Sequence, residues 1–506
     1  MMDAFLDVRG ICKAYEGVQA LKDVSLTIGR GEIHCLVGEN GSGKSTLIKC
    51  IGGVVTPDSG QIFIGGRSFE RLQAIDAIRE GVQVIYQDLS LYPNTTVAEN
   101  ISLNQFVERR SSFVNWAEVR SIAARGLAEI GEDIPLDESV QNLSVAKRQI
   151  VAITRSLTHG AKLIIMDEAT SAITRDDVDH LFSVIARLKK KGIATLFISH
   201  KLSEVFEIAE MVTIIRDGRK VGDYPTAQLD DRKLTFLMTG RDINYTPYRF
   251  PVEKRGAIPV LETRSLCRRG HFKDISFSLW PGEIVGLTGL IGSGRTELAL
   301  ALFGLNKPDS GQILLNGKVV RVRSPRDAVR FGIGYLPEDR LTQGLFIGQS
   351  IGDNIIITVV KKLLGFLGLL DPQRMRKTGE RWIADLKIKA PSAHVPAWSL
   401  SGGNQQRVVL AKWLATDPKV FILDGPTIGV DIASKSNIHE IIRSLADRGI
   451  AIIVISDEIP EILHSCNRVL VMREGFLQKE IENTAQVGEA ELLALVSGKL
   501  AVGEAR

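Results

Sequence analysis

The sequence predicts an α/β protein made of two similar domains in tandem, each built on an open, mainly parallel sheet. Three observations predict this fold class: a glycine-rich loop occurs twice, further motifs repeat at nearly the same spacing, and short apolar β-rich runs alternate with helical patterns. In such sheets ligands bind beyond the carboxyl ends of the strands. We therefore expect the functional residues along that edge.

The two glycine-rich loops have the spacing of phosphate-binding loops, in which backbone N–H groups wrap an anionic pyrophosphate. In the first loop Lys44 would supply charge to the β and γ phosphates, and the Ser45 hydroxyl would bind Mg²⁺. The second loop carries Arg295 and Thr296, and the planar fork of arginine is not equivalent to an ammonium. We expect it to bind nucleotide but to be poorly arranged to cleave it. The loops read Gly38-Glu39-Asn40-Gly41-Ser42-Gly43-Lys44-Ser45-Thr46 and Gly289-Leu290-Ile291-Gly292-Ser293-Gly294-Arg295-Thr296.

The composition is that of an ordinary globular protein. Of 506 residues, 44% are hydrophobic and 24% are charged, and the net charge of +4 gives no case for nucleic-acid binding. The five cysteines show no CxxC spacing, so we expect free, buried thiols in a reducing compartment.

No segment has the features of a signal peptide or a membrane span. The apolar stretch from Ile355 to Leu370 is interrupted by Lys361 and Lys362, whereas a bilayer span takes about 20 apolar residues. We expect a packed helix there. The protein is expected to be cytoplasmic, or held at a membrane only through a partner.

The repeat covers whole domains. Lys44 and Arg295 are 251 residues apart, and the same offset pairs Asp23 with Asp274; later motifs, beginning with Leu143 and Leu400, are 257 residues apart. A repeat this long is a domain and not a solenoid unit. We assign 1–240 to the first domain, 241–257 to a connector and 258–506 to the second domain.

In the first copy three apolar runs end at candidate functional residues. The run 33–37 precedes the glycine-rich loop, 163–166 precedes Asp167 and Glu168, and 195–198 precedes Ser199 and His200. An Asp-Glu pair can also be a simple helix N-cap, and a histidine can be a satisfied surface or core residue. Their position after buried strands favours catalysis.

The order of the motifs resembles the ATP-binding domains of ABC transporters. The second copy has a loop, then a segment that we call the signature, then an apolar strand ending in Asp424. The signature reads Leu400-Ser401-Gly402-Gly403-Asn404-Gln405-Gln406. With the segment 334–340, the fused pair resembles the ATPase subunits of bacterial monosaccharide importers of the ribose, galactose and xylose type. The resemblance implies an antiparallel β part and a helical subdomain in each domain.

The resemblance also implies roles for residues of the first copy. Tyr15 would stack on adenine, although it can also be a half-exposed aromatic at a strand end. Gln87 would contact Mg²⁺ and relay to the membrane subunit, and Asp167 would hold Mg²⁺ through water. Glu168 would polarise the attacking water, and His200 would contact the γ-phosphate.

The second copy departs from the family pattern at most of these positions. Gly270 falls near Tyr15, Glu338 matches Gln87, Gly425 matches Glu168, and Asp457 matches His200. The signature of the first copy also departs from the pattern, because Val145 and Ala146, followed by Lys147, replace its two glycines. In the family each ATP lies between the loop of one domain and the signature of the other. The first site would then combine the loop of the first copy with Ser401, Gly402, Gly403 and Asn404 of the second, and Asp431 would reach across to it. At the second site Thr174 stands at the position that matches Asp431.

Nearly all departures from the family pattern fall in the second site, which predicts one competent ATP site and one degenerate site. The leading hypothesis is an Mg²⁺-dependent ATPase subunit on the cytoplasmic face of a bacterial membrane, partnered by a permease and, indirectly, by an extracytoplasmic solute-binding protein. The solute stays open among monosaccharides, related polyols, signalling sugars and nucleosides. A soluble tandem ATPase acting on ribosomes and a nucleotide-gated regulatory protein are the alternatives; the short connector and the asymmetry disfavour the former.

Overall fold

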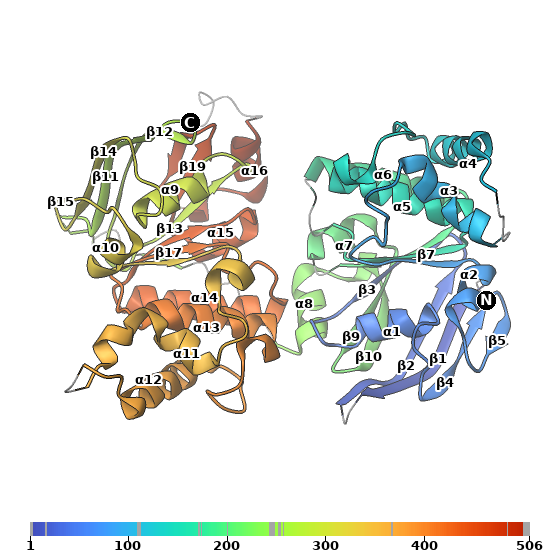
Figure 1. The fold of residues 1–506 in the computed structure, drawn as a ribbon, viewed down its shortest axis with the longest axis horizontal. Coiled ribbons are helices and arrows are strands. Elements are labelled where there is room, and N and C mark those ends of the chain that lie inside the picture. The colour runs from blue at the N-terminus through green and yellow to red at the C-terminus, as the bar shows by residue number, and fades with distance from the viewer. Residues whose placement is uncertain are drawn as a thin grey trace. The chain divides into compact units, whose positions relative to one another are not determined.

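A computed structural model of the chain describes residues 4–15, 18–108, 113–170, 173, 175–199, 201–241, 248–250, 255–256, 258–365, 368–482 and 484–498. The chain divides into two compact units, residues 1–243 (unit 1) and 244–506 (unit 2). In Figure 1 the colour runs from blue to green through unit 1 and from green-yellow to red through unit 2. Most of the expected connector, 241–257, lies outside the described residues.

Unit 1 is built on a six-stranded sheet in the order β10-β9-β3-β8-β7-β6. Neighbouring strands are parallel except for β9 and β10. β3 and β8 are buried along their whole length, as expected for strands covered on both faces. The strands are β3 (Ile33–Val37), β6 (Val82–Ile85), β7 (Leu163–Asp167), β8 (Ala194–Ile198), β9 (Met211–Arg216) and β10 (Arg219–Pro225).

A second, antiparallel sheet in unit 1 has the order β2-β1-β4-β5. Its strands are β1 (Ala4–Tyr15), β2 (Val18–Gly29), β4 (Ser59–Ile64) and β5 (Arg67–Phe69). α3, α4 and α5 pack on one another as a helical subdomain, which Figure 1 shows as one group. The helices of unit 1 are α1 (Lys44–Ile51), α2 (Ala74–Glu80), α3 (Val97–Glu108), α4 (Trp116–Glu129), α5 (Val145–Thr158), α6 (Arg175–Lys190), α7 (Leu202–Ile208) and α8 (Asp231–Thr239).

Unit 2 repeats both sheets with the same topology. Its main sheet has the order β16-β17-β18-β13-β19-β20, parallel except for the last pair, and its antiparallel sheet has the order β12-β11-β14-β15. The strands are β11 (Leu261–Arg268), β12 (Phe272–Leu279), β13 (Ile284–Gly289), β14 (Ser310–Leu315), β15 (Lys318–Val320), β16 (Ile333–Leu336), β17 (Val420–Asp424), β18 (Ala451–Ile455), β19 (Arg468–Arg473) and β20 (Phe476–Ile481).

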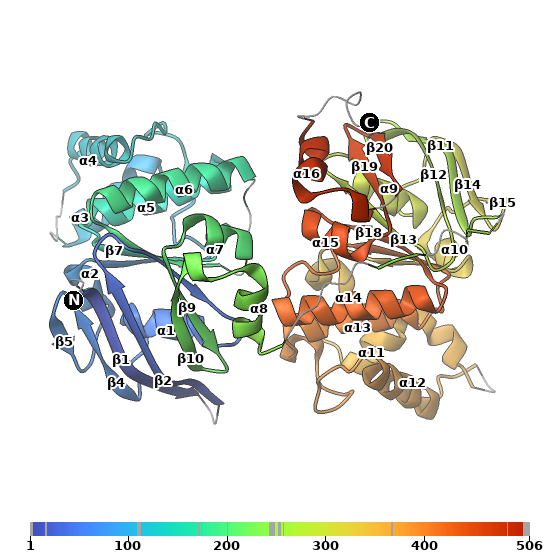
Figure 2. The same ribbon diagram turned by 180° about the vertical axis from the view of Figure 1, so that it is seen from behind.

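The helices of unit 2 cover its main sheet and form a second helical subdomain from α11, α12 and α13. Figure 2 shows α14 and α15 beside the strands from the opposite side to Figure 1. The helices are α9 (Arg295–Leu302), α10 (Pro325–Arg330), α11 (Ile351–Ile356), α12 (Pro372–Asp385), α13 (Gly402–Leu414), α14 (Ile432–Asp447), α15 (Ile459–Ser465) and α16 (Glu489–Ser497).

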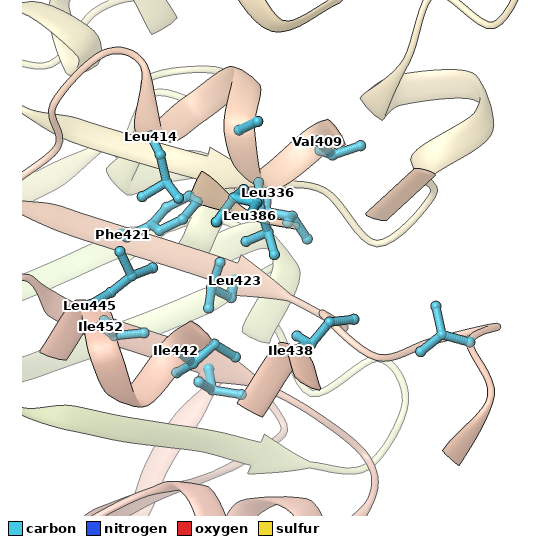
Figure 3. Close-up of a cluster of buried hydrophobic side chains, with 14 of the residues drawn as sticks. Leu336, Leu386, Val409, Leu414, Phe421, Leu423, Ile438, Ile442, Leu445 and Ile452 are labelled. Atoms are coloured by element: carbon cyan, nitrogen blue, oxygen red, sulfur yellow. The ribbon is translucent and has the colours of Figure 1, made fainter. Parts of the chain in front are cut away.

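A continuous apolar core joins the main sheet of unit 2 to its helices. Figure 3 shows Phe421 and Leu423 of β17 between Leu414 of α13 and Ile442 of α14. All four side chains are buried. This packing holds the end of β17, where Asp424 lies, in a fixed position against α13 and α14.

The expected helix over 355–370 is wrong in extent. α11 ends at Ile356, a 3₁₀ segment continues to Leu363, and Leu364 pairs with Leu370 in an antiparallel bridge. Gly368, with φ 70°, lies between these two leucines, so the end of the apolar run contains a left-handed residue that a helix would not. Across the described residues, no helix combines the length and hydropathy that a bilayer crossing requires.

The cysteines are free, as expected, but not all are buried. Cys35, Cys50 and Cys466 are buried, whereas Cys12 and Cys267 are half-buried. The last two occupy matching places, because each sulfur accepts a 3.3 Å hydrogen bond from a backbone N–H, that of Asp23 or Asp274. The repeat read from the sequence therefore extends to local hydrogen bonding.

Candidate functional site

The first glycine-rich loop connects β3 to α1 and has room only for glycine at two positions. A Cβ on Gly38 would lie 2.2 Å from the Ile215 carbonyl oxygen, and one on Gly43 would lie 2.6 Å from that of Ala20. Gly43 also has φ 106° where α1 begins. The backbone therefore turns back on itself before the helix, which leaves the N–H groups of the first turn facing the loop.

Lys44 and Ser42 line the inside of this loop. The Lys44 ammonium is buried and donates to the carbonyl oxygens of Gly38 and Glu39 at 2.7 and 2.9 Å. The Ser42 hydroxyl is buried without a hydrogen-bond partner in the described structure. A buried cation beside an unsatisfied hydroxyl suits an oxyanion, so the loop fits a phosphate group.

The remaining loop residues differ in exposure. Asn40 and Ser45 are exposed, and Glu39 and Thr46 are half-buried. Ser45 and Thr46 lie in the first turn of α1, beside the loop. Gly41 has φ 79°, and an added Cβ there would meet nothing within 4 Å. The mouth of the loop is therefore open for a phosphate chain.

Asp167 and Glu168 lie at the carboxyl end of β7. Glu168 has φ 50°, and its N–H donates to the Ile198 carbonyl oxygen at 3.2 Å, so the pair turns off the strand and is not a helix N-cap. Burial raises the pKa of Asp167, and the neighbouring Glu168 charge adds to this, while the Lys44 ammonium opposes it. Two adjacent carboxylates with one partly buried are the oxygen donors that Mg²⁺ prefers.

A buried carboxylate that the sequence analysis missed joins the ends of β7 and β8. The Glu204 Oε2 atom accepts hydrogen bonds from the hydroxyls of Thr170 and Ser199, both at 2.6 Å. The Lys201 ammonium lies 3.2 Å from the other carboxylate oxygen. His200, which follows Ser199, lies outside the described residues. The 257-residue offset, which pairs Glu204 with Glu461, was the signal that could have identified this group.

Two further candidates of unit 1 are accessible. Tyr15 ends β1 with 43% of its surface exposed, and the Lys13 ammonium lies 5.7 Å from the centre of its ring. Gln87 is exposed just after β6. Tyr15 is thus a partly exposed aromatic at a strand end, and an open aromatic face is compatible with base stacking.

The second glycine-rich loop keeps the same backbone shape. A Cβ on Gly289 would lie 2.2 Å from the Met472 carbonyl oxygen, and one on Gly294 would lie 2.5 Å from that of His271. Gly292 and Gly294 have φ values of 81° and 97°. The Ser293 hydroxyl, like that of Ser42, is buried without a partner in the described structure. The phosphate cradle of unit 2 is therefore preserved.

The basic residue of the second loop makes different contacts from Lys44. The Arg295 Nη2 atom lies 2.5 Å from Asp457 Oδ1 and 3.5 Å from the Leu290 carbonyl oxygen. Its Nη1 atom donates to the Ser456 carbonyl oxygen at 3.3 Å. The guanidinium is thus tied to the end of β18 and carries its own carboxylate counter-ion.

The chain after β17 makes the same backbone turn as after β7, but with Gly425 in place of Glu168. Gly425 has φ 58°, and its N–H donates to the Ile455 carbonyl oxygen at 2.9 Å. The Asp424 carboxylate accepts a 3.2 Å hydrogen bond from the Tyr335 hydroxyl. Burial raises the pKa of Asp424 to about 6, and the Glu338 charge adds to this.

The position of Tyr15 in unit 1 is occupied by a glycine in unit 2. The N–H of Ala14 donates to Asp58 at 2.7 Å, and the N–H of Arg269 donates to Asp309 at 2.6 Å, so these positions match. Gly270, with φ 79°, therefore stands where unit 1 has Tyr15.

The signature residues Ser401, Gly402, Gly403 and Asn404 form the start of α13. Ser401 is the N-cap residue but makes no capping bond, because its hydroxyl accepts a 2.9 Å hydrogen bond from the Asn404 amide. In unit 1 the hydroxyl of Ser144 instead accepts from the N–H of Lys147 at 3.3 Å and caps α5. The first turn of α13 therefore lacks a side-chain cap that α5 has, which favours an external anion there.

Side chains that were not predicted hold the signature in place. A Cβ on Gly403 would lie 2.2 Å from the Ser434 hydroxyl, which itself donates to the Asp431 carboxylate at 2.9 Å. Asp431 is the N-cap of α14. The Arg340 guanidinium donates to the carbonyl oxygens of Ile428 and Gly429 at 2.8 and 3.2 Å. Thr174, the match of Asp431, lies outside the described residues.

Comparison with known proteins identifies a single family over most of the chain. The profile of the family described as ABC transporter matches residues 21–171 and 272–428. A putative ribose/galactose/methyl galactoside import ATP-binding protein of Geobacillus kaustophilus is 41% identical over 501 residues, 98% of each chain. The ribose import ATP-binding protein RbsA of Caldanaerobacter subterraneus is 38% identical over 98% of this chain and 100% of its own.

Single ATP-binding cassettes among the solved structures match less than half of this chain. The crystal structure of a nucleotide-free ATP-binding cassette from an ABC transporter is 24% identical, with a TM-score of 0.42. It covers 47% of this chain and 100% of its own.

Proposed function

Because this chain belongs to the ABC transporter family of ATP-binding proteins, we propose that it is the ATP-hydrolysing subunit of a bacterial importer for a monosaccharide or a related polyol. The proposed solute class rests on the full-length relatives, which are named as ribose or galactose import proteins. A nucleoside or signalling-sugar importer is the alternative solute assignment. A tandem ATPase acting on ribosomes is a distant alternative.

The observation that carries the proposal is the complementary asymmetry of the two units. Unit 1 holds Lys44 in an open phosphate loop, with Asp167 and Glu168 at the end of β7. Unit 2 holds the signature with both glycines and without a side-chain cap on α13. We propose that ATP in the loop of unit 1 is closed by Ser401, Gly402 and Gly403 of unit 2, with Asp431 at its edge.

In this proposal the residues of unit 1 divide the chemistry among them. The loop and Lys44 bind the phosphate chain, Tyr15 stacks on the base, and Glu168 orients the attacking water. His200 is proposed to contact the γ-phosphate. Ser45, Gln87 and Asp167 would hold Mg²⁺, which neutralises charge on the transferring phosphoryl group when bound.

The second site is proposed to be degenerate. It combines Arg295 with its counter-ion Asp457, a glycine at position 425, and the altered signature that begins at Val145. Without a water-orienting group, turnover there is expected to be lower by about 10² to 10⁴-fold. Each time the two units close around ATP, one hydrolysis event would then change the contacts between the chain and its partner.

The proposed partner is an integral membrane permease, and the proposed location is the cytoplasmic face of the inner membrane, where the chain is peripheral. A solute-binding protein would act on the permease from the other side. Co-purification of the chain with an integral membrane protein after mild detergent extraction would support this assignment. Co-sedimentation with ribosomes and not with membranes would contradict it.

The catalytic assignment is tested with two matched pairs of variants in the full chain. Glu168→Gln is expected to lose turnover but to retain ATP binding. The same change at a carboxylate of unit 2 that matches Gln87 and not Glu168, Glu338→Gln, is expected to keep turnover. Lys44→Ala is expected to abolish ATPase activity, while Arg295→Ala at the matching position preserves it. Unchanged turnover in Glu168→Gln would reject the site and favour a protein in which hydrolysis is incidental.

A further inference from the structure

We propose that the phosphate loop of unit 2 is a site for a diphosphate group, presented by a nucleoside diphosphate or by free pyrophosphate, and that it discriminates against triphosphates. The inference rests on the assignment of unit 2 as a nucleotide-binding domain. It goes beyond the degenerate character of that site, because it assigns a ligand and a physical reason for the choice.

The cradle for two phosphates is intact. The glycine-rich backbone of unit 2 makes the same close approaches as that of unit 1, at Gly289 to Met472 and at Gly294 to His271. The Ser293 hydroxyl is 4% exposed and has no hydrogen-bond partner in the described structure. Backbone N–H groups of such loops hold the α and β phosphates, and an unsatisfied buried hydroxyl there is explained by a ligand oxygen.

A carboxylate stands where the third phosphate would be received. In such loops the basic residue reaches the β and γ phosphates. In unit 2 that residue, Arg295, is 8% exposed, and its Nη2 atom lies 2.5 Å from Asp457 Oδ1. The side chain of Asp457 is 59% exposed, so its charge is accessible to a ligand that reaches Arg295. A γ-phosphate would have to displace this carboxylate or lie against it.

Both consequences disfavour a triphosphate more than a diphosphate. A carboxylate beside a binding surface repels a ligand whose negative charge must lie against it, and a ligand that stays clear of it avoids this repulsion. The guanidinium is already engaged by the Ser456 and Leu290 carbonyl oxygens, which limits its freedom to follow a longer phosphate chain. A diphosphate uses the cradle without entering this region.

Recognition of the base is expected to be weak. Gly270 occupies the place of Tyr15, so the aromatic platform of unit 1 has no equivalent at that position. ADP, GDP and inorganic pyrophosphate therefore form the series that separates the two sources of the diphosphate. Similar affinity for all three assigns the site to the diphosphate group alone, whereas tighter binding of ADP and GDP than of pyrophosphate assigns it to nucleoside diphosphates.

The test uses the full chain carrying Lys44→Ala, so that the loop of unit 1 is disabled. Equilibrium dialysis with labelled ADP and ATP is expected to show ADP binding at least about tenfold more tightly. Adding Asp457→Asn should raise ATP affinity about tenfold or more and leave ADP affinity within about threefold. Asp457→His, which introduces the residue type of unit 1, should act in the same direction.

The matched control is the neighbouring carboxylate. Glu458 pairs with Lys435 at 2.6 Å and not with Arg295, so Glu458→Gln should leave both affinities unchanged. Equal affinity for ADP and ATP would overturn the proposal, as would an Asp457→Asn variant without selective gain or the failure of every ligand to bind. ATPase activity is measured separately in the unmodified chain. If that chain showed no activity, the proposed function of unit 1 would be wrong, whereas this inference about unit 2 would not be affected.

Discussion

Glu168 and Gly425 share one backbone conformation, with φ values of 50° and 58°, and each N–H donates to the last residue of the neighbouring strand. This left-handed conformation costs a residue with a side chain about 1 to 2 kcal/mol, whereas glycine adopts it freely. Unit 1 thus keeps a strained glutamate where unit 2 keeps a relaxed glycine. Strain retained at one copy only is typical of a functional position.

Introducing glutamate at position 425 is predicted not to create a second hydrolytic site. A Cβ there would lie 2.4 Å from the Ile428 side chain and 3.3 Å from that of Glu338. Gly425→Glu should therefore destabilise unit 2 by about 1 to 3 kcal/mol and leave ATPase activity unchanged. Urea unfolding and steady-state turnover measure the two effects. Turnover that appears only when a carboxylate is present at 425 would refute the assignment of Glu168.

The Glu204 carboxylate is predicted to position the catalytic edge of unit 1 without touching nucleotide. Its Oε2 atom accepts from both Thr170 and Ser199, and its Oε1 atom lies 3.2 Å from the Lys201 ammonium. An amide would turn its NH₂ group toward one of these donors and so loosen the ends of β7 and β8. Glu204→Gln should lower kcat by about tenfold or more and leave KM for ATP nearly unchanged, since small misplacements of catalytic groups are costly. Glu207→Gln, on the exposed side of the same helix, is the control; a matching loss there would point to general destabilisation.

The matching carboxylate of unit 2 predicts a pH-dependent stability. Glu461 accepts from the hydroxyls of Thr427 and Ser456, and the His439 ring lies 3.5 Å away. Burial raises the pKa of Glu461 to about 7 and lowers that of His439 to about 3. Glu458, Lys435, Arg443 and His464 are the other titratable groups that act on this pair.

The sign of the effect follows from where the proton is bound. Folded Glu461 keeps its proton up to about pH 7, and the unfolded chain loses it near pH 4.5, so its stabilising contribution is present below pH 4.5 and is lost as pH rises through 7. Glu461→Gln fixes the neutral form. Its stability relative to the unmodified chain should therefore rise by about 3 kcal/mol between pH 4.5 and pH 8.

Unit 1 supplies the control for this measurement. The Lys201 ammonium lies beside Glu204, whereas Glu458 stands at the position of Lys201 in unit 2. Glu204→Gln removes an ion pair, so its stability should stay below that of the unmodified chain at neutral pH. Denaturant unfolding at several pH values separates the two variants. A flat difference curve for Glu461→Gln would show that the buried carboxylate is ionised throughout.

The motifs that could be predicted from sequence are those whose chemistry is local. The strand ends before Gly38, Asp167 and Ser199 were recognisable because buried parallel strands are short apolar runs, and the loop glycines are required by close backbone approaches. The family and the two-domain architecture followed from the order of these motifs, and the family match confirms both.

The contacts that could not be predicted join residues distant in sequence. The Arg295 to Asp457 ion pair and the Arg340 bonds to Ile428 and Gly429 depend on tertiary placement, which residue spacing does not specify. The 355–370 segment was misjudged because an apolar run alone does not separate a helix from a 3₁₀ turn and a bridge. The roles assigned to the site residues stay predictions, and His200 and Thr174 lie outside the described residues.

The two signature serines are predicted to have opposite roles, which separates activity from stability. Ser144 caps α5 through the N–H of Lys147, so Ser144→Ala should cost about 1 kcal/mol of stability and leave ATPase activity intact. Ser401 makes no such cap, so Ser401→Ala should leave stability nearly unchanged but lower turnover about tenfold or more, because the lost hydroxyl is one that a bound phosphate would use. If Ser144→Ala were the variant that lost turnover, the signature of unit 1 would be the one that closes the working site, and the proposed pairing of the units would be wrong.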